Sequence, residues 1–314
     1  MRIVGTTNKN VSCIWTTIGK GIEEFGKIVN LQTTVYDRED FLQNRIQGTE
    51  EQTIFIFEAG TPQHAGYSMA KMKGLFPNSV FIALSSDAII YKKHLGNDQL
   101  DYKYVDILLD VEDEAVDFYK RKYSLIGEKW LWTTSKWLMD KAESFYFMYM
   151  DELFHGRRTQ IEFYDLICVA LFSGPYRTEL KKYLVENNIR LTNGGGCGHE
   201  DNDLHRLFTH YLQSKCTLGT TSHNNPIIRG MKGFRDWLGP CLGAPLIYDN
   251  YPQVMGAYGT VVPYYDYTDF SSIKPTMEST FKNRVNILKS QMDWLSNNTI
   301  EEQLYKVCKK YGVL

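Results

Sequence analysis

The stretch KGFRDWLGPCLGAPLIYDN, residues 232–250, contains the pattern that decides the fold. Its first part, FRDWLGPCLG at 234–243, predicts a short helix. Its second part, APLIYDN at 244–250, is an apolar run that stops at an aspartate and predicts a buried strand. The small residues of GPCLGAP would let the helix lie close to that strand. A helix followed by a strand that is apolar on both faces is typical of a parallel sheet covered by helices.

The same alternation of apolar runs and helical patterns continues along the chain in both directions. Further strands are predicted at 2–7, 53–60, 79–87, 105–111, 167–174, 189–196 and 216–222. Helices are predicted at 13–28, 67–76, 112–123, 176–188 and 203–215, and over most of the chain from 279 to its end. Strands that alternate with helices indicate βαβ units with right-handed crossovers. We therefore predict an α/β fold.

The length of 314 residues is too great for one ordinary core and suits two domains. The βαβ rhythm is interrupted in the middle of the chain, where we predict one or two helices and a linker near 155–160. We expect a Rossmann-like domain at 1–155 and a second one at 156–290, facing each other across a cleft. The segment 291–314 would be a helix that packs back on the N-terminal domain.

Composition and charge exclude several classes of protein. The net charge of -2 argues against a protein that coats nucleic acid through bulk charge, although a local basic groove is compatible with it. No apolar run approaches the roughly 20 residues that cross a bilayer. The six cysteines are scattered, and we interpret them as reduced thiols of a cytoplasmic protein.

Candidate ligand-binding residues follow the predicted strands, because ligands of parallel sheets bind beyond the carboxyl ends of the strands. In SGPYR, Gly174 would let backbone approach a ligand, and Arg177 in the first turn of the next helix could bind a phosphate. The alternative is a surface arginine after a turn. In NGGG, Gly194 and Gly195 would serve a tight turn or a close ligand, and the alternative is a flexible loop.

Residues 232–250 and the predicted strand before them supply the other binding candidates. Lys232, Arg235 and Asp236 gather at the start of the short helix, and Ser222 lies at the end of the preceding strand. These residues would bind an anionic ligand. The alternative is a surface ion pair of small energetic value on a helix that is held by its apolar residues.

Three residues of the first half are candidates for a general base. Asp87 ends SSD at the tip of a predicted buried strand, where a carboxylate is well placed to take a proton. It could instead cap the next helix. Glu58 and His64, at the end of the preceding predicted strand, are the rival candidates.

A metal site is the weaker interpretation of CGHEDNDLHRLFTHYLQSKC. Its histidines and cysteines match no common zinc spacing, and His205 and His210 are five residues apart, so they do not share one helix face. Cys216 also opens a predicted buried strand. We therefore predict no metal.

Taken in order, these motifs resemble the donor domain of GT-B glycosyltransferases, especially the group related to spore-maturation proteins. The resemblance covers about 167–275 and is carried by SGPYR, LTNGGG, SKCTLG, KGFRDWLGPCLGAPLIYDNYPQV and the acidic-aromatic YYDYTDF. The SSD strand end resembles the S/T-D of phage DNA glucosyltransferases, where the aspartate is the base. One position departs from the pattern: Leu238 stands where the family has a ribose-binding Glu, so either Asp236 takes that role or ribose is held differently.

The resemblance implies metal-independent transfer of a hexosyl or pentosyl group from a UDP-sugar to a hydroxyl, without a permanently bound cofactor. Arg177, Lys232 and Arg235 would neutralise the diphosphate, and Asp87 would take the acceptor proton. Our first expectation for the acceptor is a 5-hydroxymethylpyrimidine in double-stranded phage DNA, modified in the host cytoplasm. Basic residues that could contact its phosphates are Lys92, Lys93, Arg157, Arg158, Lys181 and Lys182.

Three alternatives remain open from the sequence. The acceptor could be a protein or a small molecule. The chain could bind nucleotide sugars without catalysis. It could also be a different α/β enzyme with a similar site, such as one that acts on phosphate esters.

Overall fold

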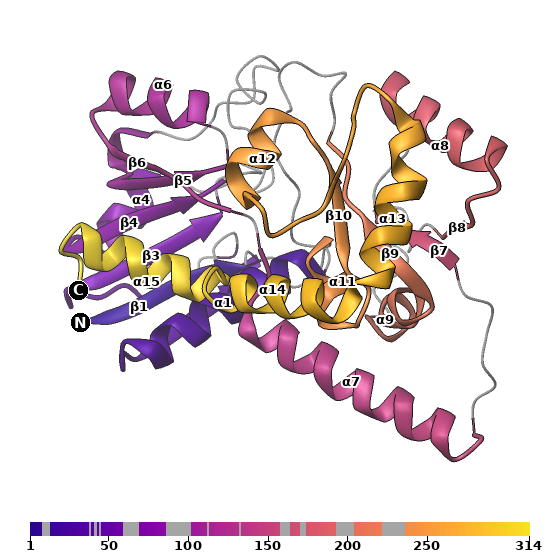
Figure 1. The fold of residues 1–314 in the computed structure, drawn as a ribbon. Coiled ribbons are helices and arrows are strands. Elements are labelled where there is room, and N and C mark those ends of the chain that lie inside the picture. Colours follow the sequence, from indigo (N-terminus) through magenta and orange to yellow (C-terminus); the bar gives the residue numbers. More distant parts are fainter. Residues whose placement is uncertain are drawn as a thin grey trace. The chain divides into compact units, whose positions relative to one another are not determined.

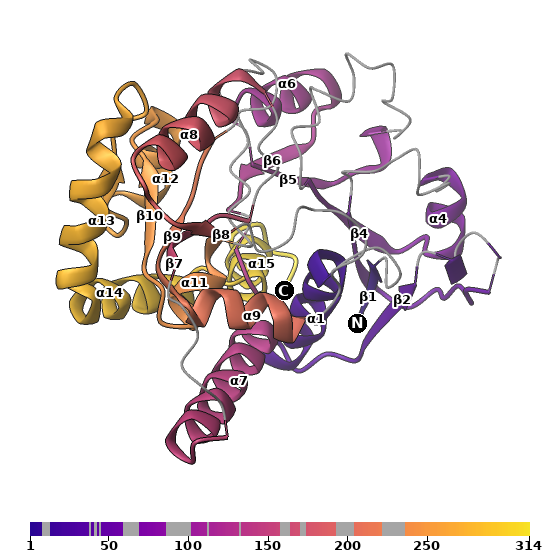
Figure 2. The same ribbon diagram turned by 90° about the vertical axis from the view of Figure 1, so that its right-hand side faces the viewer.

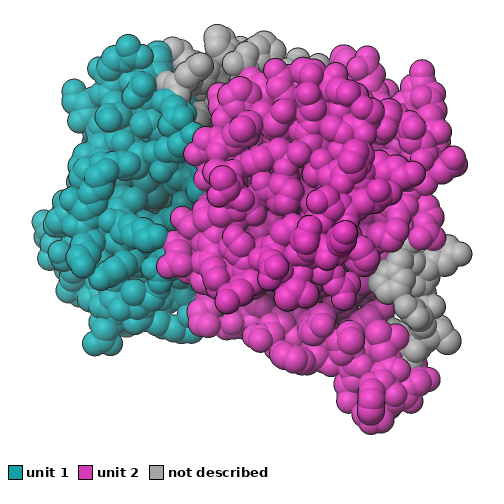
Figure 3. All heavy atoms as spheres, viewed as in Figure 1, with its two compact units in different colours: residues 1–135, 225–230, 299–314 teal, residues 136–224, 231–298 magenta. Residues whose placement is uncertain are grey.

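The computed structural model describes residues 1–7, 13–37, 39–40, 43, 45–58, 69–85, 102–111, 113–131, 133–157, 164–169, 174–192, 204–221 and 236–314. The chain divides into two compact units (Figure 3). Unit 1 comprises 1–135, 225–230 and 299–314, and unit 2 comprises 136–224 and 231–298.

Unit 1 contains a six-stranded sheet in the order β2-β1-β3-β4-β5-β6, and each neighbouring pair is parallel (Figure 1). The strands are β1 (Arg2–Thr7), β2 (Thr33–Asp37), β3 (Thr53–Glu58), β4 (Ser79–Leu84), β5 (Ile107–Asp110) and β6 (Ile126–Lys129). The central strands are rich in β-branched and aromatic residues, and Phe55 of β3 packs against Phe76 and Phe81 with ring centroids 5.3 and 5.1 Å apart. These rings fill the core on one face of the sheet.

The helices of unit 1 come from both ends of the chain. They are α1 (Cys13–Ile28), α4 (Met69–Leu75), α6 (Asp113–Tyr123), α15 (Ile300–Lys310) and the short 3-10 helix η1 (Tyr102–Tyr104). Helix α15 packs on α1 where Gly21 leaves space for Ile300. The side chain of Gln303 also exchanges hydrogen bonds with both backbone groups of Leu131, at 2.8 and 2.9 Å. The C-terminal helix is therefore part of unit 1.

Unit 2 contains a five-stranded parallel sheet in the order β11-β10-β9-β7-β8. The strands are β7 (Tyr164–Ile167), β8 (Leu191–Thr192), β9 (Ser214–Leu218), β10 (Leu246–Asp249) and β11 (Tyr264–Tyr265). Its helices are α7 (Lys136–Phe154), α8 (Pro175–Glu186), α9 (Leu204–Leu212), α11 (Leu238–Cys241), α12 (Pro252–Tyr258), η2 (Phe270–Ser272), α13 (Ile273–Lys282) and α14 (Arg284–Ser296).

The two sheets share one strand order. In each, the second strand lies on one side of the first and the third strand lies on the other. The chain therefore reverses direction across the sheet between β1 and β3 in unit 1, and between β7 and β9 in unit 2. Such switch points are where α/β sheets bind ligands, at the carboxyl ends of the strands.

Most predicted elements are confirmed, and one strand is wrong in position. Strand β1 and helix α1 occur at the predicted residues 2–7 and 13–28. The strand predicted at 167–174 instead runs over Tyr164–Ile167. The observed strand includes a charged residue, Asp165, which apolar periodicity does not predict inside a strand. The Asp165 carboxylate accepts a hydrogen bond from the Lys215 ammonium of β9 at 2.6 Å, so the strand tolerates this charge.

The small residues of the opening stretch do bring a helix close to the sheet, as predicted. A Cβ built on Gly239 of α11 would lie 1.8 Å from Oγ1 of Thr217 in β9 and 2.7 Å from the carbonyl oxygen of Ala244. Gly219, just after β9, is similarly covered by the ring of Tyr248, which a Cβ would meet at 2.1 Å. Any larger residue at these glycines would overlap backbone or buried side chains.

Replacing Gly239 by alanine tests this close approach. We expect Gly239→Ala to lower the free energy of unfolding by about 1–3 kcal/mol, because the methyl group must displace Thr217 or the Ala244 carbonyl. Gly256→Ala in α12 is the matched control, since a Cβ there meets nothing within 4 Å. The control should be neutral or stabilising by up to about 1 kcal/mol. Urea denaturation measures the stability of both variants. Equal stabilities would contradict the close packing of Gly239 against Thr217 and Ala244.

Candidate functional site

Figure 2 shows the neighbouring strands β7, β9 and β10 of unit 2. Polar groups gather at the carboxyl ends of these three strands. We name this group the carboxyl-edge site. It consists of Gly174 and Arg177 at the start of α8, Thr220 and Thr221 after β9, and Asp249 at the end of β10.

Helix α8 begins at the site because glycine and proline set its first turn. Gly174 has φ 89° and ψ 155°, a backbone conformation that other residues rarely adopt, and proline occupies the first position of the helix. Among the residues that the structure describes, no side chain caps this end. The first turn of a helix carries backbone N–H groups without intrahelical acceptors and a partial positive charge, and both favour an anion.

Arg177 ties α8 to the strand across the switch point. Its guanidinium Nη2 donates a hydrogen bond to the carbonyl oxygen of Thr220 at 3.2 Å. This bond holds the guanidinium at the carboxyl end of β9, beside the first turn of α8. A planar group with several donors, fixed next to a helix N-terminus, is suited to bind a phosphate.

Asp249 is a carboxylate with no solvent exposure at the tip of an apolar strand. Its Oδ2 accepts hydrogen bonds from the backbone N–H of Thr221 at 2.7 Å and from the Thr221 hydroxyl at 2.9 Å. The bonds fix the segment that follows β9 against β10. Burial of the two phenols is the main cause that raises the pKa of Tyr176 and of Tyr265, and the negative charge of Asp249 raises both further. Both phenols are therefore neutral at physiological pH.

Asp236 lies before α11 in a buried aromatic setting. Asp236 is 7% exposed. Burial of Tyr248, together with the negative charge of Asp236, raises the pKa of the Tyr248 phenol well above its ordinary value. The next residue, Trp237, stacks on Trp294 of α14 with ring centroids 4.5 Å apart. Leu238 is fully buried in the core of unit 2. The position where the resembling family has a ribose-binding Glu is therefore a core position in this chain.

The structure describes only part of the predicted site. Arg177 donates to the carbonyl of Thr220, and Gly174 lies at the start of the same helix, α8. Asp236 lies before α11. Glu58 ends β3, with its side chain outside the description. The predicted residues that lie outside the described part are His64, Asp87, Gly194, Gly195, Ser222, Lys232 and Arg235. Their roles stay predictions.

The strand end that leads toward Asp87 is held firmly in unit 1. Ser85 is fully buried, its backbone N–H donates to the carbonyl of Leu109 at 2.8 Å, and its own carbonyl accepts from the indole of Trp130 at 2.9 Å. Asp110, at the end of the neighbouring β5, is also fully buried. The carboxyl edge of the first sheet therefore carries a buried acid as the second sheet does.

Sequence reasoning missed five residues of the carboxyl edges: Tyr176, Thr220, Thr221 and Asp249 in unit 2 and Asp110 in unit 1. The signal for both aspartates was present. Each ends a short apolar run, ILLD and LIYD, just as Asp87 follows SVFIALSS. A carboxylate at the tip of a buried strand needs donors nearby, which predicts that it organises the loops around it.

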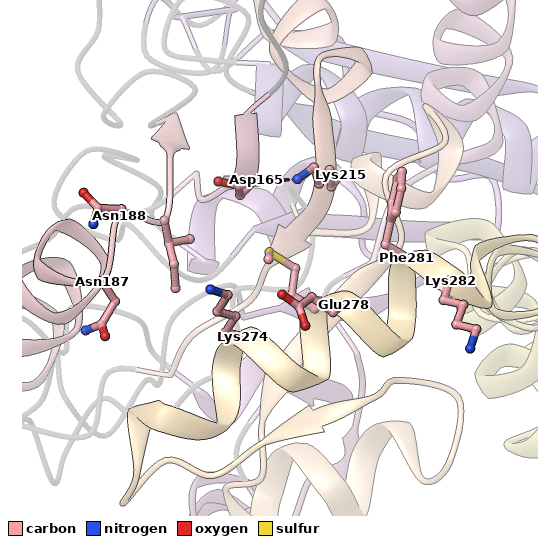
Figure 4. Close-up of a pocket in the computed structure, with 10 residues that line it drawn as sticks. Asp165, Asn187, Asn188, Lys215, Lys274, Glu278, Phe281 and Lys282 are labelled. Carbon is pink, nitrogen blue, oxygen red and sulfur yellow. Dashed lines mark hydrogen bonds and ion pairs between the residues drawn. The ribbon is translucent and has the colours of Figure 1, made fainter.

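A pocket of about 360 Å³ lies at the opposite edge of the unit 2 sheet (Figure 4). It is bordered by Asp165 and Lys215 near the amino ends of β7 and β9, and by Lys274 and Glu278 of α13. Burial alone would raise the pKa of Asp165, but hydrogen bonds from Lys215 and the backbone of Arg190 outweigh it and hold the pKa below its ordinary value. No residue predicted for the site lines this pocket.

The histidines and the cysteine of the rejected metal motif have structural contacts where they are described. The His205 ring packs on Phe145, His210 Nδ1 lies 3.2 Å from the Thr192 hydroxyl, and Cys216 is fully buried. Within the described ranges no three His, Cys, Asp or Glu side chains form a group that could hold a metal ion. Nor does any helix placed there have the length and apolar character to cross a membrane.

No protein-family model matches the sequence, and no curated protein matches it. The fold is nevertheless similar to that of solved enzymes. One similar fold is the crystal structure of AviGT4, a glycosyltransferase involved in avilamycin A biosynthesis. The match has a TM-score of 0.57 and 9% sequence identity, and it covers 98% of this chain and 96% of the AviGT4 chain. Another is an α-glucosyltransferase in complex with UDP and a 13-mer DNA. This match has a TM-score of 0.52 and 8% sequence identity, and it covers 100% of this chain and 98% of the glucosyltransferase chain.

A third structure is an α,α-trehalose-phosphate synthase (UDP-forming) from Burkholderia vietnamiensis, with a TM-score of 0.51, 9% identity and coverage of 98% and 90%. Together with the two parallel sheets, these similarities confirm the predicted α/β class and the GT-B fold with two Rossmann-like domains. The narrower likeness to the group related to spore-maturation proteins stays a prediction.

Removing the Asp249 carboxylate tests whether it organises the carboxyl-edge site. Asp249→Ala leaves the buried N–H of Thr221 without its acceptor, so we expect the free energy of unfolding to fall by about 2–4 kcal/mol. Asp249→Asn keeps a side-chain oxygen that can accept from Thr221, so it should lower the free energy of unfolding by less. Asp293→Ala, at an exposed position of α14, should stay within about 0.5 kcal/mol of the wild type. Similar losses at the two positions in a urea titration would refute the organising role.

Proposed function

We propose that this protein is a glycosyltransferase that uses a UDP-sugar and binds the donor at the carboxyl-edge site of unit 2. The observation that carries the proposal is the Arg177 guanidinium, held by the Thr220 carbonyl beside the first turn of α8 at the β7–β9 switch point. The similarity in fold to a solved α-glucosyltransferase in complex with UDP supports it.

The donor diphosphate would lie against the first turn of α8. Backbone N–H groups and Arg177 would neutralise its charge, with Lys232 and Arg235 as further predicted cations. Gly174, Gly194 and Gly195 would allow close approach of the backbone, and Ser222 would follow Thr221 into the site. These donors would also stabilise the charge that develops on UDP as it leaves, so the proposal requires no metal ion.

The transfer step follows from these assignments. The acceptor hydroxyl oxygen forms a bond to the anomeric carbon of the sugar, and the bond from that carbon to the UDP oxygen breaks with its electron pair on UDP. Asp87 takes the hydroxyl proton, with Glu58 and His64 as the alternatives. Asp236 would bind the ribose, because Leu238 is buried and apolar.

For the acceptor we propose a 5-hydroxymethylpyrimidine in double-stranded DNA. The SSD motif supports this choice, as does the similarity in fold to a structure that holds DNA. Of the basic residues predicted to contact phosphates, Arg157, Lys181 and Lys182 are described, and all three are exposed. A protein or small-molecule acceptor and a non-catalytic nucleotide-sugar binder remain the alternatives that the experiments below separate.

The first experiment measures UDP release from a panel of UDP-sugars with hydroxymethylated duplex DNA, with the same unmodified duplex, and without DNA. We expect release that depends on the hydroxymethyl group, and Asp87→Asn should reduce it by about 100-fold or more because a general base is lost. The affinity for UDP should not change in that variant. Release with other acceptors only would exclude DNA, and failure of UDP to bind would exclude the donor site itself.

A second experiment tests Arg177 by calorimetric titration with UDP. Arg177→Ala should weaken UDP binding by about 10- to 100-fold, as expected for the loss of a charge-assisted bond to phosphate. Arg177→Lys should recover only part of the affinity, because an ammonium lacks the planar fork. Lys181→Ala, which removes one exposed cation from the same helix, is the control and should bind UDP like the wild type. Equal affinities for Arg177→Ala and the control would place the diphosphate elsewhere.

A further inference from the structure

The pocket at the amino edge of the unit 2 sheet is built from several elements and shares no residue with the carboxyl-edge site (Figure 4). Helix α13 supplies one wall. Lys274, Met277, Glu278 and Phe281 are spaced i, i+3, i+4 and i+7, so they share the face of α13 that borders the pocket. The segment 187–189, between α8 and β8, supplies another wall.

An ion pair between strands β7 and β9 borders the pocket on the side of the sheet. The Asp165 carboxylate accepts from the Lys215 ammonium at 2.6 Å and from the backbone N–H of Arg190 at 2.9 Å. Both oxygens of Asp165 therefore have donors from the protein. An ammonium has three N–H groups, and this contact uses one of those of Lys215. The others can donate to a ligand in the pocket.

Two side chains of α13 border the pocket without partners of their own. Lys274 and Glu278 lie one helical turn apart, and Figure 4 shows the Glu278 carboxylate directed toward Lys274. Across the ranges given above, neither side chain forms a hydrogen bond or an ion pair. A cation and a carboxylate that face one space without meeting can each bind a different group of the same ligand.

The charge around the pocket favours an anion. The pocket is bordered by three lysines and two carboxylates: Lys215, Lys274, Lys282, Asp165 and Glu278. Arg190 adds a fourth cation, because its Nε lies 3.8 Å from Asp165. This group therefore has a net charge of +2, whereas the whole chain has -2. A nucleic acid backbone suits the pocket less well, since it calls for a row of cations without carboxylates among them.

We propose that this pocket binds a sugar phosphate, a ligand that combines one phosphate group with several hydroxyls. The lysines would bind the phosphate. Glu278 and the side-chain amides of Asn187 and Asn188 would exchange hydrogen bonds with the hydroxyls. Met277 and Phe281 would contact the apolar face of the sugar ring. The volume of about 360 Å³ is in the range of small-molecule sites. This inference does not depend on the proposed sugar transfer.

Calorimetric titration of the full chain with a panel of hexose and pentose phosphates, the free sugars and inorganic phosphate tests the proposal. At least one sugar phosphate should bind with a dissociation constant below about 1 mM. The free sugar and inorganic phosphate should each bind at least tenfold more weakly, because each makes only part of the contacts. Absence of binding across the panel, or equal affinities for inorganic phosphate and every sugar phosphate, would overturn the proposal.

Replacing Lys274 locates the phosphate. Lys274→Ala should weaken binding of the sugar phosphate at least fivefold, as expected for the loss of a charge-assisted bond. Lys289→Ala removes an exposed cation of α14 outside the pocket, so it is the matched control and should bind like the wild type. Both lysines are exposed, and neither change should alter thermal stability. The same affinity in the two variants would overturn the site.

Replacing Asn188 tests the contact with the hydroxyls. Asn188 has φ 54°, in the left-handed region, so Asn188→Gly keeps the backbone and removes only the amide. The sugar phosphate should bind about threefold more weakly or worse, as expected for one lost neutral hydrogen bond. The affinity for inorganic phosphate should not change. Unchanged binding of the sugar phosphate, or an equal loss for both ligands, would overturn the assignment of the hydroxyls to this wall.

Arg177→Ala and competition distinguish this pocket from the carboxyl-edge site. The sugar phosphate should bind Arg177→Ala as it binds the wild type, and saturating UDP should not displace it. Loss of binding in that variant, or displacement by UDP, would assign the sugar phosphate to the donor site and overturn the proposal. Displacement by unmodified duplex DNA would assign the pocket to nucleic acid and overturn it as well.

Discussion

The hydrogen bond from Arg177 to the carbonyl of Thr220 joins the start of one helix to the end of a strand that is not its neighbour in sequence. It forms because the parallel sheet of unit 2 reverses its strand order between β7 and β9. Asp249 completes the arrangement by holding Thr221 from the adjoining strand β10. Three separate segments thus meet at one sheet edge, and the proposed donor site depends on this meeting.

The cost of burying the Asp249 carboxylate indicates why the site is built in this way. An unpaired buried charge would be strongly destabilising, whereas here two donors of Thr221 satisfy one carboxylate oxygen. Thr221 is therefore fixed against β10. The close contacts of Gly219 and Gly239 serve the same end, because they bring the aromatic layer and α11 directly onto the strands.

Much of the fold could be predicted from the sequence, because buried parallel strands read as apolar runs. Strands such as RIVGTT and the amphipathic helix at 13–28 follow directly from periodicity. The edge strands β2 and β6 could not be recognised, because they are short and only half buried. Strand β7 was placed too late because the prediction followed the apolar run at 167–174, whereas the observed strand includes Asp165, whose partner Lys215 lies 50 residues further along the chain.

The site was predictable only in its single-segment features. SGPYR identified a glycine and an arginine at a helix start, and both are there. The contact of Arg177 with Thr220 and the role of Asp249 depend on which strands are neighbours, which local patterns do not contain. The burial of Leu238 shows the same limit, since its place in the core is set by α14 and by the aromatic rings around Trp237.

The most direct test of the central claim is hydrogen–deuterium exchange of the whole protein with and without UDP. The account predicts slower exchange on UDP binding in peptides that cover 174–180 and 218–221, the start of α8 and the end of β9. Peptides that cover 187–190 and 274–282, which border the pocket at the opposite sheet edge, should be unchanged. Protection of the second set in place of the first would contradict the account.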